Sequence, residues 1–210
     1  MGGPHFHFDA AYFAANEVGG DFYQVMPQID GGLLVMVGDV SGKGLRAAMV
    51  GTLIVGAFRA LAQEERSPAK VLLRLNRQLM VSVSDGFVTC LVLHLTPEGQ
   101  GLIANAGHLA PYRNGEEVAC DGGLPLGLAA QSEYTETALQ LAPGDMLTFL
   151  SDGVVEARNS VGELFGFDRT RTISSLPAVE IARTAQQFGQ EDDITVIAVT
   201  RTGVLEPETA

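Results

Sequence analysis

The sequence predicts an α+β domain in which β-sheets are covered by helices. Strand-like runs open the chain, two helix-like segments follow one another, and further strand-like runs surround one last helix. Elements with one apolar face must bury that face against another layer, and this order of elements is typical of α+β domains. The length of 210 residues fits one domain, residues 1–210, with a core over about residues 6–202.

The first half of the chain contains two strand regions and then a helix. Apolar residues alternate irregularly over residues 6–22, and a short apolar run covers residues 33–37, so both regions are predicted as strands. Residues 44–62 lack proline and are mostly small or apolar, which predicts a helix covered on more than one side. Gly51 and Gly56 would each cost about 1 kcal/mol relative to alanine. We therefore expect another backbone to pack closely against them.

The second predicted helix, residues 67–83, is amphipathic. Ser67 and Pro68 are typical of an N-cap followed by a first helical turn. The apolar residues share one face of this helix, and they are Val71, Leu72, Leu75 and Leu79. A one-sided apolar stripe predicts that the helix lies on the surface of a sheet.

The second half of the chain is predicted to be mainly antiparallel strands, because glycine, proline and asparagine turns separate short apolar runs. These strand-like runs cover residues 87–95, 101–106, 133–141 and 146–151. A last helix is predicted over residues 177–188, where one stripe is apolar and Gly189 ends the pattern. The run ITVIAV then predicts a final strand.

Composition and charge exclude several classes of partner. The net charge is −12 and no block of Lys or Arg is present, so binding to nucleic acid or to an anionic membrane is not expected. No apolar run reaches the 18 residues of a bilayer helix, and the N-terminus lacks the pattern of a signal peptide. Cys90 lies in an apolar run, where a buried free thiol is the ordinary expectation. Together these features predict a soluble domain in the reducing cytoplasm.

Four short segments place aspartate beside glycine or at the end of a predicted strand. They are GGDFY with Asp21, GDVSGKG with Asp39, LSDGVVEA with Asp152, and EDDITV with Asp192 and Asp193. A single aspartate of this kind often only caps backbone N–H groups in a turn. Four of them together favour a site for hard divalent cations such as Mg²⁺ or Mn²⁺, which prefer carboxylate oxygens. Without a cation, such a cluster would repel itself and raise carboxyl pKa values.

Eight motifs, in the same order, resemble those of bacterial PP2C-like (PPM) serine phosphatases, in the SpoIIE/RsbU-like branch of sporulation and stress response. The motifs are EVGGDFYQV, VGDVSGKGLRAAM, FVTCLV, NAGHLAPY, GLPLGL, LSDGVVEARN, GELFGFDR and EDDITVIAV. One motif would be weak evidence, whereas eight in series are strong. The resemblance implies a layered β-sandwich flanked by α-helices, with a metal centre at one edge.

The resemblance also implies a set of metal ligands. Asp39 matches the carboxylate that bridges two Mn²⁺ or Mg²⁺ ions. Asp21 and the backbone carbonyl of Val40 would complete the shell of one ion, while Asp152 and Asp192 would hold the other. Three further residues are expected next to these ligands, namely Asp193, Gly153 and Lys43.

The resemblance implies a protein phosphatase whose metal-activated water attacks the phosphorus of phosphoserine in line, without a covalent intermediate. Its expected substrate is a phosphorylated STAS-domain anti-sigma factor antagonist. Two alternatives stay open: a non-catalytic regulatory module that binds a partner, and a hydrolase of small phosphate monoesters. His108, in NAGH, is expected to form hydrogen bonds within its loop.

Family members usually carry an N-terminal sensory or receiver module, and this chain begins almost at its first motif. We therefore expect it to be part of a longer protein, which could be membrane-tethered although this domain is not expected to touch a membrane. The helices at 44–62 and 67–83 are expected to mediate a homodimer and to order the metal site. Val55 and Phe58 are the positions chosen for a charge substitution that would test this.

Overall fold

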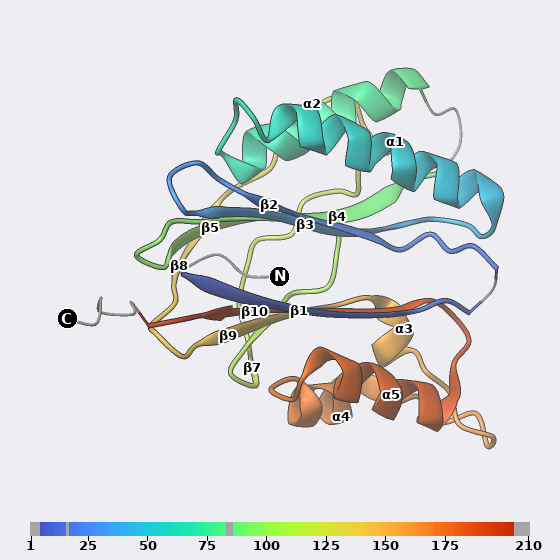
Figure 1. The fold of residues 1–210 in the computed structure, drawn as a ribbon. Coiled ribbons are helices and arrows are strands. Elements are labelled where there is room, and N and C mark those ends of the chain that lie inside the picture. The colour runs from blue at the N-terminus through green and yellow to red at the C-terminus, as the bar shows by residue number, and fades with distance from the viewer. Residues whose placement is uncertain (1–4, 16, 83–85, 204–210) are drawn as a thin grey trace.

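The computed structural model describes residues 5–15, 17–82 and 86–203. Two five-stranded sheets lie face to face, and helices cover the outer face of each sheet (Figure 1). The named strands in both sheets pair in antiparallel fashion. The predicted α+β sandwich flanked by helices is confirmed.

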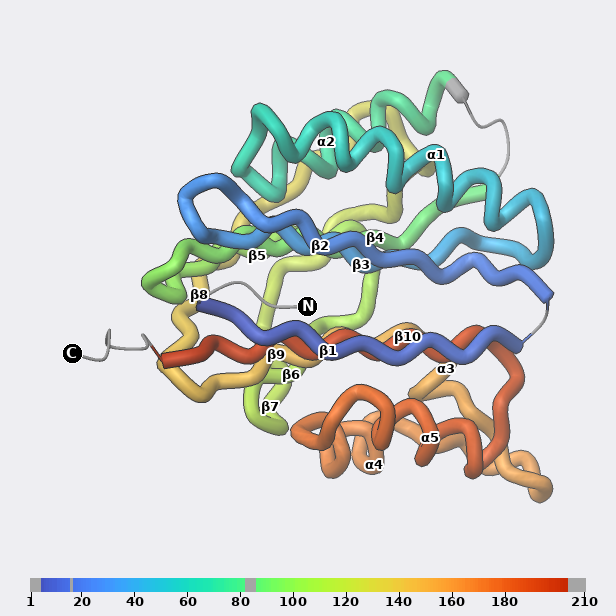
Figure 2. Tube along the Cα trace, viewed as in Figure 1, coloured from blue at the N-terminus to red at the C-terminus, as the bar shows by residue number. Residues whose placement is uncertain are grey.

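The first sheet brings together the two ends of the described chain. Its strands, in spatial order, are β1 (Phe6–Phe13), β10 (Ile194–Arg201), β9 (Met146–Leu150), β6 (Tyr112–Arg113) and β7 (Glu116–Glu117). Figure 2 shows β1 and β10 side by side along their whole length, with Phe6 opposite Arg201 and Phe13 opposite Ile194. Three helices cover this sheet, and they are α3 (Asp152–Val155), α4 (Gly166–Ile173) and α5 (Ala178–Gly189).

The second sheet is built almost entirely from the first half of the chain. Its strands, in spatial order, are β2 (Phe22–Pro27), β3 (Leu33–Val40), β4 (Val88–Leu95), β5 (Gln100–Ala106) and β8 (Thr137–Gln140). Its outer face is covered by α1 (Leu45–Leu61) and α2 (Pro68–Ser82).

The continuous apolar run of β3 follows from burial on both faces of the strand. Leu34 and Met36 belong to the core under α1 and α2, whereas the alternate residues Leu33, Val35 and Val37 pack between the two sheets. Successive strand residues point to opposite faces, so a strand covered on both sides needs apolar residues at every position. The strand extends beyond the predicted run to Val40, and Asp39 therefore lies within it.

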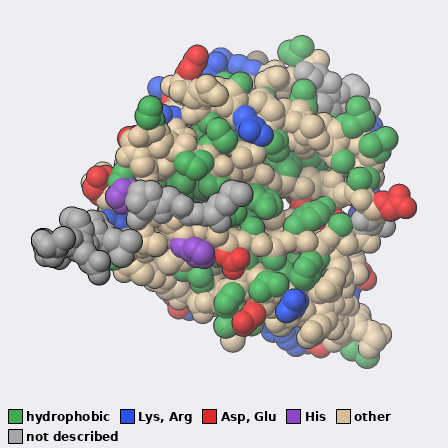
Figure 3. Space-filling model, in the orientation of Figure 1, with side chains coloured by type: hydrophobic (Ala, Val, Ile, Leu, Met, Phe, Trp, Pro, Cys, Tyr) green, Lys and Arg blue, Asp and Glu red, His purple; other side chains and the backbone are tan. Residues whose placement is uncertain are grey.

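Helix α1 packs on β2 and β3 of the second sheet and along α2, so it is covered on more than one side as predicted, while a further face is exposed. Its buried residues follow helical spacing and face the second sheet; they are Ala47, Gly51, Ile54 and Phe58. Leu45, Met49 and Leu53 are exposed on another face. Figure 3 shows apolar side chains along the upper part of the molecule, where α1 lies.

The expectations for two α1 residues, Gly56 and Phe58, need correction. A Cβ at Gly56 would meet no atom within 4 Å, so no other backbone packs against this glycine, whereas a Cβ at Gly51 would be in ordinary contact with the Phe22 side chain, 3.4 Å away. Phe58 is completely buried in the core, which makes it unsuitable as a surface position. Val55 is partly buried against the same core.

Helices α2 and α5 confirm their predictions. Ser67 Oγ accepts a hydrogen bond from Lys70 N at 3.3 Å, as expected of an N-cap. The predicted apolar stripe of α2 is buried, and so are the alanines and Ile181 of α5. The predicted end of the second helix at Val83 lies outside the described residues.

Short elements account for most of the differences from the predicted strands and helices. Of the predicted strand at 133–141 only β8 is formed, and the β6–β7 hairpin, α3 and α4 were not predicted.

In residues 5–15, 17–82 and 86–203, no helix is long and apolar enough to cross a membrane.

Candidate metal centre

The segments that carry the predicted acidic residues meet at one edge of the sandwich, on the right in Figure 1. The connection from β1 to β2 crosses from the first sheet to the second and carries Asp21. Asp39 lies near the end of β3, and Asp152 opens α3 directly after β9. Asp192 and Asp193 immediately precede β10. Both sheets therefore contribute acidic residues to the same edge.

Asp193 ties the β1–β2 connection to the start of β10. Its Oδ1 accepts a hydrogen bond from Ala15 N and its Oδ2 accepts one from Gly20 N, both at 2.9 Å. The residue is only 5% exposed. A Cβ on Gly19 would lie 1.6 Å from Asp193 Oδ2, so only glycine fits this approach. Asp193 thus holds the loop that presents Asp21.

Two hydroxyl groups that sequence reasoning missed complete this network. Thr195 Oγ1 donates a hydrogen bond to Asp21 Oδ2 at 2.6 Å. Ser151 Oγ donates to the carbonyl of Asp193 at 3.1 Å and accepts from Thr195 N at 2.9 Å. The available signal was their place in the acidic motifs, because Ser151 directly precedes Asp152 and Thr195 follows Asp193 by two residues.

The carboxyl groups of the cluster have raised pKa values. Burial, reinforced by the charges of Asp39 and Asp152 and opposed by hydrogen bonds from Thr195 and Ser151, raises the pKa of Asp21 to about 8. Burial and the charges of Asp152 and Asp192 raise the pKa of Asp39 to about 7. Burial also raises the pKa of Asp152. A bound dication would reverse this effect by favouring the ionised carboxylates.

Asp39 and Val40 form the clearest pair of oxygen donors. A Cβ on Gly20 would lie 2.7 Å from Asp39 Oδ1 and 2.8 Å from the Val40 carbonyl oxygen, so both oxygens face this glycine. Across the described residues, no group of three or more His, Cys, Asp and Glu side chains is arranged to hold a metal ion. Mg²⁺ is usually bound through one or two carboxylates with several waters retained, and the Asp39–Val40 pair fits that kind of donor set.

Lys43 and Gly153, both expected beside the ligands, contact the acidic segment before β10. Lys43 Nζ forms an ion pair with Asp192 Oδ2 at 2.9 Å, and this contact raises the pKa of Lys43. A Cβ on Gly153 would lie 2.0 Å from the carbonyl oxygen of Asp193. Only glycine therefore allows α3 to start this close to β10.

His108 is a buried structural residue, as expected. Its backbone N donates to Asn105 Oδ1 at 2.8 Å, and its carbonyl accepts from Asn105 Nδ2 at 2.9 Å. Its Nδ1 lies 3.0 Å from Thr89 Oγ1 on β4. Burial lowers the pKa of His108 to about 4, and the backbone carbonyl of Leu150 opposes this shift only in part. The imidazole is therefore neutral at pH 7.

The phosphoserine phosphatase RsbU of Bacillus subtilis is similar to this chain in sequence. The chain is 28% identical to it over 204 residues, which cover 89% of this chain and 61% of RsbU. The chain thus spans less than two thirds of the length of this relative.

Solved structures show the same fold. The RsbU and RsbW domains of Rv1364c from Mycobacterium tuberculosis match with a TM-score of 0.81 at 24% identity, covering 95% of this chain and 61% of that one. The SiaA-PP2C domain of Pseudomonas aeruginosa matches with a TM-score of 0.78 at 25% identity, covering 93% and 86%. RsbX, solved in complex with magnesium, matches with a TM-score of 0.73 at 15% identity, covering 94% and 96%. The fold is that of PP2C domains.

Agreement in fold is matched by agreement in sequence over most of the chain. The family model described as stage II sporulation protein E (SpoIIE) matches residues 29–202, a range that includes Asp39, Asp152 and Asp192. Asp21 lies just before this range, within the segment that Asp193 holds. The chain therefore belongs to the SpoIIE family.

Proposed function

We propose that the chain is a metal-dependent protein phosphatase that hydrolyses phosphoserine. The observation that carries this proposal is the convergence of Asp21, Asp39 and Asp152 at one edge, where burial and the charges of neighbouring carboxylates raise their carboxyl pKa values. Such a cluster is costly unless a cation neutralises it. The similarity to RsbU, a phosphoserine phosphatase, supports the assignment.

Two Mn²⁺ or Mg²⁺ ions are the proposed cofactors. Asp39 would bridge them, with Asp21 and the Val40 carbonyl on one side and Asp152 and Asp192 on the other. When bound, such ions lower the pKa of a coordinated water and neutralise phosphate charge. The magnesium in the structure of RsbX supports a divalent ion.

The chain's own residues prepare the centre by fixing its ligands. Thr195 orients Asp21 through its hydroxyl group, and Asp193 fixes the loop in front of it. These contacts keep carboxylate oxygens in place before a cation and a phosphate arrive, which lowers the cost of ordering them.

The proposed substrate is a phosphorylated STAS-domain anti-sigma factor antagonist in the cytoplasm. The proposal rests on the family resemblance and on the similarity to RsbU. In the same way we propose that an N-terminal sensory or receiver module accompanies this domain in a longer protein. Such a module would set when the centre is active.

A homodimer through α1 and α2 is also proposed. Leu45 and Met49 on α1 are 69% and 65% exposed, and Val81 at the end of α2 is 90% exposed. Gly56 leaves space on α1 where another backbone could approach. Burying such a surface in a symmetric contact would remove apolar area from water.

Manganese-dependent dephosphorylation of a phosphoserine STAS protein tests the proposed activity. We expect Asp39→Asn and Asp152→Asn each to lower kcat/KM at least about 100-fold, because each removes a charged ligand. Both variants should also bind Mn²⁺ more weakly by calorimetry. Asp168→Asn, which changes an exposed aspartate on α4, is the matched control and should behave as wild type.

The two alternatives predict different results. Turnover of p-nitrophenyl phosphate without turnover of phosphoserine proteins would support a hydrolase of small phosphate monoesters. If neither substrate is turned over at any Mn²⁺ or Mg²⁺ concentration, the result favours a regulatory module or a domain that is inactive without its sensory module.

A further inference from the structure

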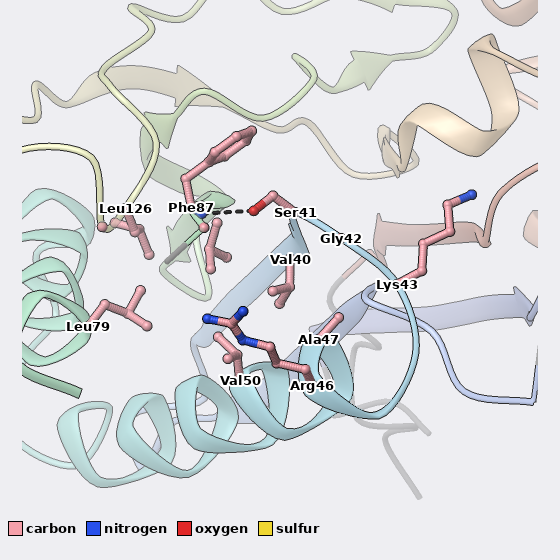
Figure 4. A pocket seen from close by; sticks show the side chains of 13 residues that line it. Val40, Ser41, Gly42, Lys43, Arg46, Ala47, Val50, Leu79, Phe87 and Leu126 are labelled. Carbon is pink, nitrogen blue, oxygen red and sulfur yellow. Dashed lines mark hydrogen bonds between the residues drawn. The ribbon is translucent and has the colours of Figure 1, made fainter. Parts of the chain in front are cut away.

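The outer face of α2 carries a row of basic residues. Lys70, Arg74 and Arg77 are all exposed, and their spacing of four and then three residues places them on one face of the helix. The opposite face is buried in the core, where Leu79 lines a small cavity together with Val50 of α1 (Figure 4). The row, here called the basic stripe, therefore faces away from the sheet that α2 covers.

The two helices on this side of the molecule differ in charge from the rest of the chain. All the charged residues of α1 and α2 are basic, whereas α4 and α5 each contain both signs. The whole chain has 25 acidic and 13 basic residues. The basic stripe is therefore a local exception on an acidic protein.

Within the described residues, the side chains of the basic stripe form no ion pair or hydrogen bond. By contrast, Arg158, Arg169 and Arg171 each pair with a glutamate. Two carboxylates at the start of α2, those of Glu65 and Glu136, accept hydrogen bonds from backbone N–H groups instead. The stripe is thus available to carboxylates from outside the chain.

The charges of the basic stripe are unfavourable for α2 on its own. Like charges three or four residues apart on a helix repel each other. Lys70 also lies in the first turn, where a cation opposes the helix dipole. Carboxylates bound along the stripe would cancel this repulsion, so the arrangement suits a partner better than it suits the isolated helix.

The chemistry of the stripe favours an acidic protein as that partner. Two of its three residues are arginines, whose guanidinium groups bind carboxylates in a bidentate manner. The net charge of −12 repels a long polyanion such as nucleic acid beyond the three cations. A symmetric contact with a second copy of the chain, centred on the stripe, would bring the same cations together.

We propose that the basic stripe of α2 docks an acidic helix of a partner protein. The stripe is about 10 Å long, because a helix rises about 1.5 Å per residue. Glutamates at positions i, i+4 and i+7 of a partner helix have the same spacing, so each cation meets one carboxylate. The proposal does not rest on the phosphatase function, since none of the three residues belongs to the candidate metal centre.

Chemical-shift mapping by NMR tests this surface with defined probes. The ¹⁵N-labelled chain is titrated with three helical peptides of equal length. One carries glutamates at i, i+4 and i+7, one carries glutamines there, and one carries the same glutamates on different faces. The first should shift the amide signals of α2 and bind about tenfold more tightly than the second and about threefold more tightly than the third. These preferences should disappear in about 1 M NaCl, where charges are screened over about 3 Å.

Charge substitutions assign the binding to the stripe. Arg74→Glu should raise the Kd of the first peptide about tenfold, because an attractive pair becomes a repulsive one. Arg183→Glu makes the same change at an exposed position of α5 and should leave this Kd unchanged. Arg74→Gln should raise the Tm of the chain by about 1 to 3 °C, because it removes two repulsive contacts within α2.

Several results would overturn the proposal. Equal binding of the glutamate and glutamine peptides, or shifts confined to other elements, would show that the stripe does not select carboxylates. An equal loss of binding in Arg183→Glu would reduce the effect to net charge, and a lower Tm in Arg74→Gln would mean that the stripe stabilises the fold. Shifts of α2 that grow with the chain's own concentration would identify a second copy as the occupant. Tighter binding of phosphatidylserine vesicles or of a single-stranded oligonucleotide would identify a polyanion.

Discussion

Helices α1 and α5 occupy equivalent positions on opposite sides of the sandwich, yet their outer faces differ. Both bury a small-residue and apolar stripe against a sheet. The exposed face of α5 carries polar side chains such as Arg183 and Gln187, whereas the face of α1 exposes Leu45 and Met49. A polar outer face is typical of a helix whose outer face is in contact with solvent, whereas an apolar outer face is typical of a contact surface. From this difference we expect the α1 side, and not the α5 side, to form the dimer contact proposed above.

The strongest test of this difference compares one substitution by aspartate on each helix. Ile181 on α5 is 0% exposed, so Ile181→Asp buries a carboxylate and should lower the free energy of unfolding by about 4 kcal/mol or more. Met49→Asp on α1 should change it by less than about 0.5 kcal/mol. Urea unfolding followed by circular dichroism, at concentrations where the chain is monomeric, measures both. Equal losses would contradict the contrast between the helices.

A second test concerns His108, which links the sheets because it contacts Thr89 on β4 and lies near the carbonyl of Leu150 on β9. Its folded pKa of about 4 is below the value of 6.5 expected without burial. Its contribution to stability is therefore complete above about pH 6.5 and is lost as the pH falls towards 4.

His108→Gln cannot take up this proton. Between pH 6.5 and 4 the stability of wild type should fall more steeply than that of the variant, by up to about 1.4 kcal/mol per pH unit. Thermal unfolding at a series of pH values gives both slopes. Parallel slopes would show that His108 is not buried as a neutral group.

A third test concerns the proposed dimer. Met49→Asp places a charge in the exposed apolar face of α1 and should raise the dimer dissociation constant at least about tenfold, because an unpaired carboxylate would be buried in the contact. Sedimentation equilibrium measures this constant. Gln187→Asp introduces the same charge on the outer face of α5 and should leave association unchanged. A dimer that tolerates Met49→Asp would have to use another surface.

The smallest expected effect concerns the ion pair between Lys43, just before α1, and Asp192, just before β10. Lys43 competes with a cation for the carboxylate of Asp192. Lys43→Met should tighten Mn²⁺ binding about two- to fivefold in calorimetry, the range of an exposed ion pair. Arg158→Met removes a nearby pair with Glu191 and should have no effect. Weaker Mn²⁺ binding in Lys43→Met would show that the lysine supports the ion instead.

Local patterns were sufficient to predict the elements that bury one regular face. The stripes of α2 and α5 and the apolar runs of β3 and β4 are properties of consecutive residues, and each element is present. Helix α3 has only four residues, too few for a periodic pattern. Which face of α1 stays exposed could not be predicted, because small and apolar residues lie nearly all around this helix.

The candidate site was predictable as a set of residues but not as a set of contacts. The motifs identified the five aspartates, and the fold brings their segments to one edge. The hydrogen bond of the Thr195 hydroxyl and the ion pair of Lys43 depend on pairings between distant segments. Side-chain directions of this kind follow from tertiary packing, which a single sequence does not encode in any local pattern.

The position of β10 has a consequence for how the protein is made. Among the strands of the described residues only this one pairs with β1, and Asp193, just before it, accepts hydrogen bonds from Ala15 and Gly20, which lie 178 and 173 residues earlier. Ribosomes add about 5 to 20 residues per second, so roughly 10 to 35 s separate the synthesis of these partners. A nascent chain therefore carries Asp21 and Asp39 long before it can align them with Asp193. Products of premature termination before β10 would lack the contacts that hold the loop with Asp21, so translation itself delays the assembly of this edge.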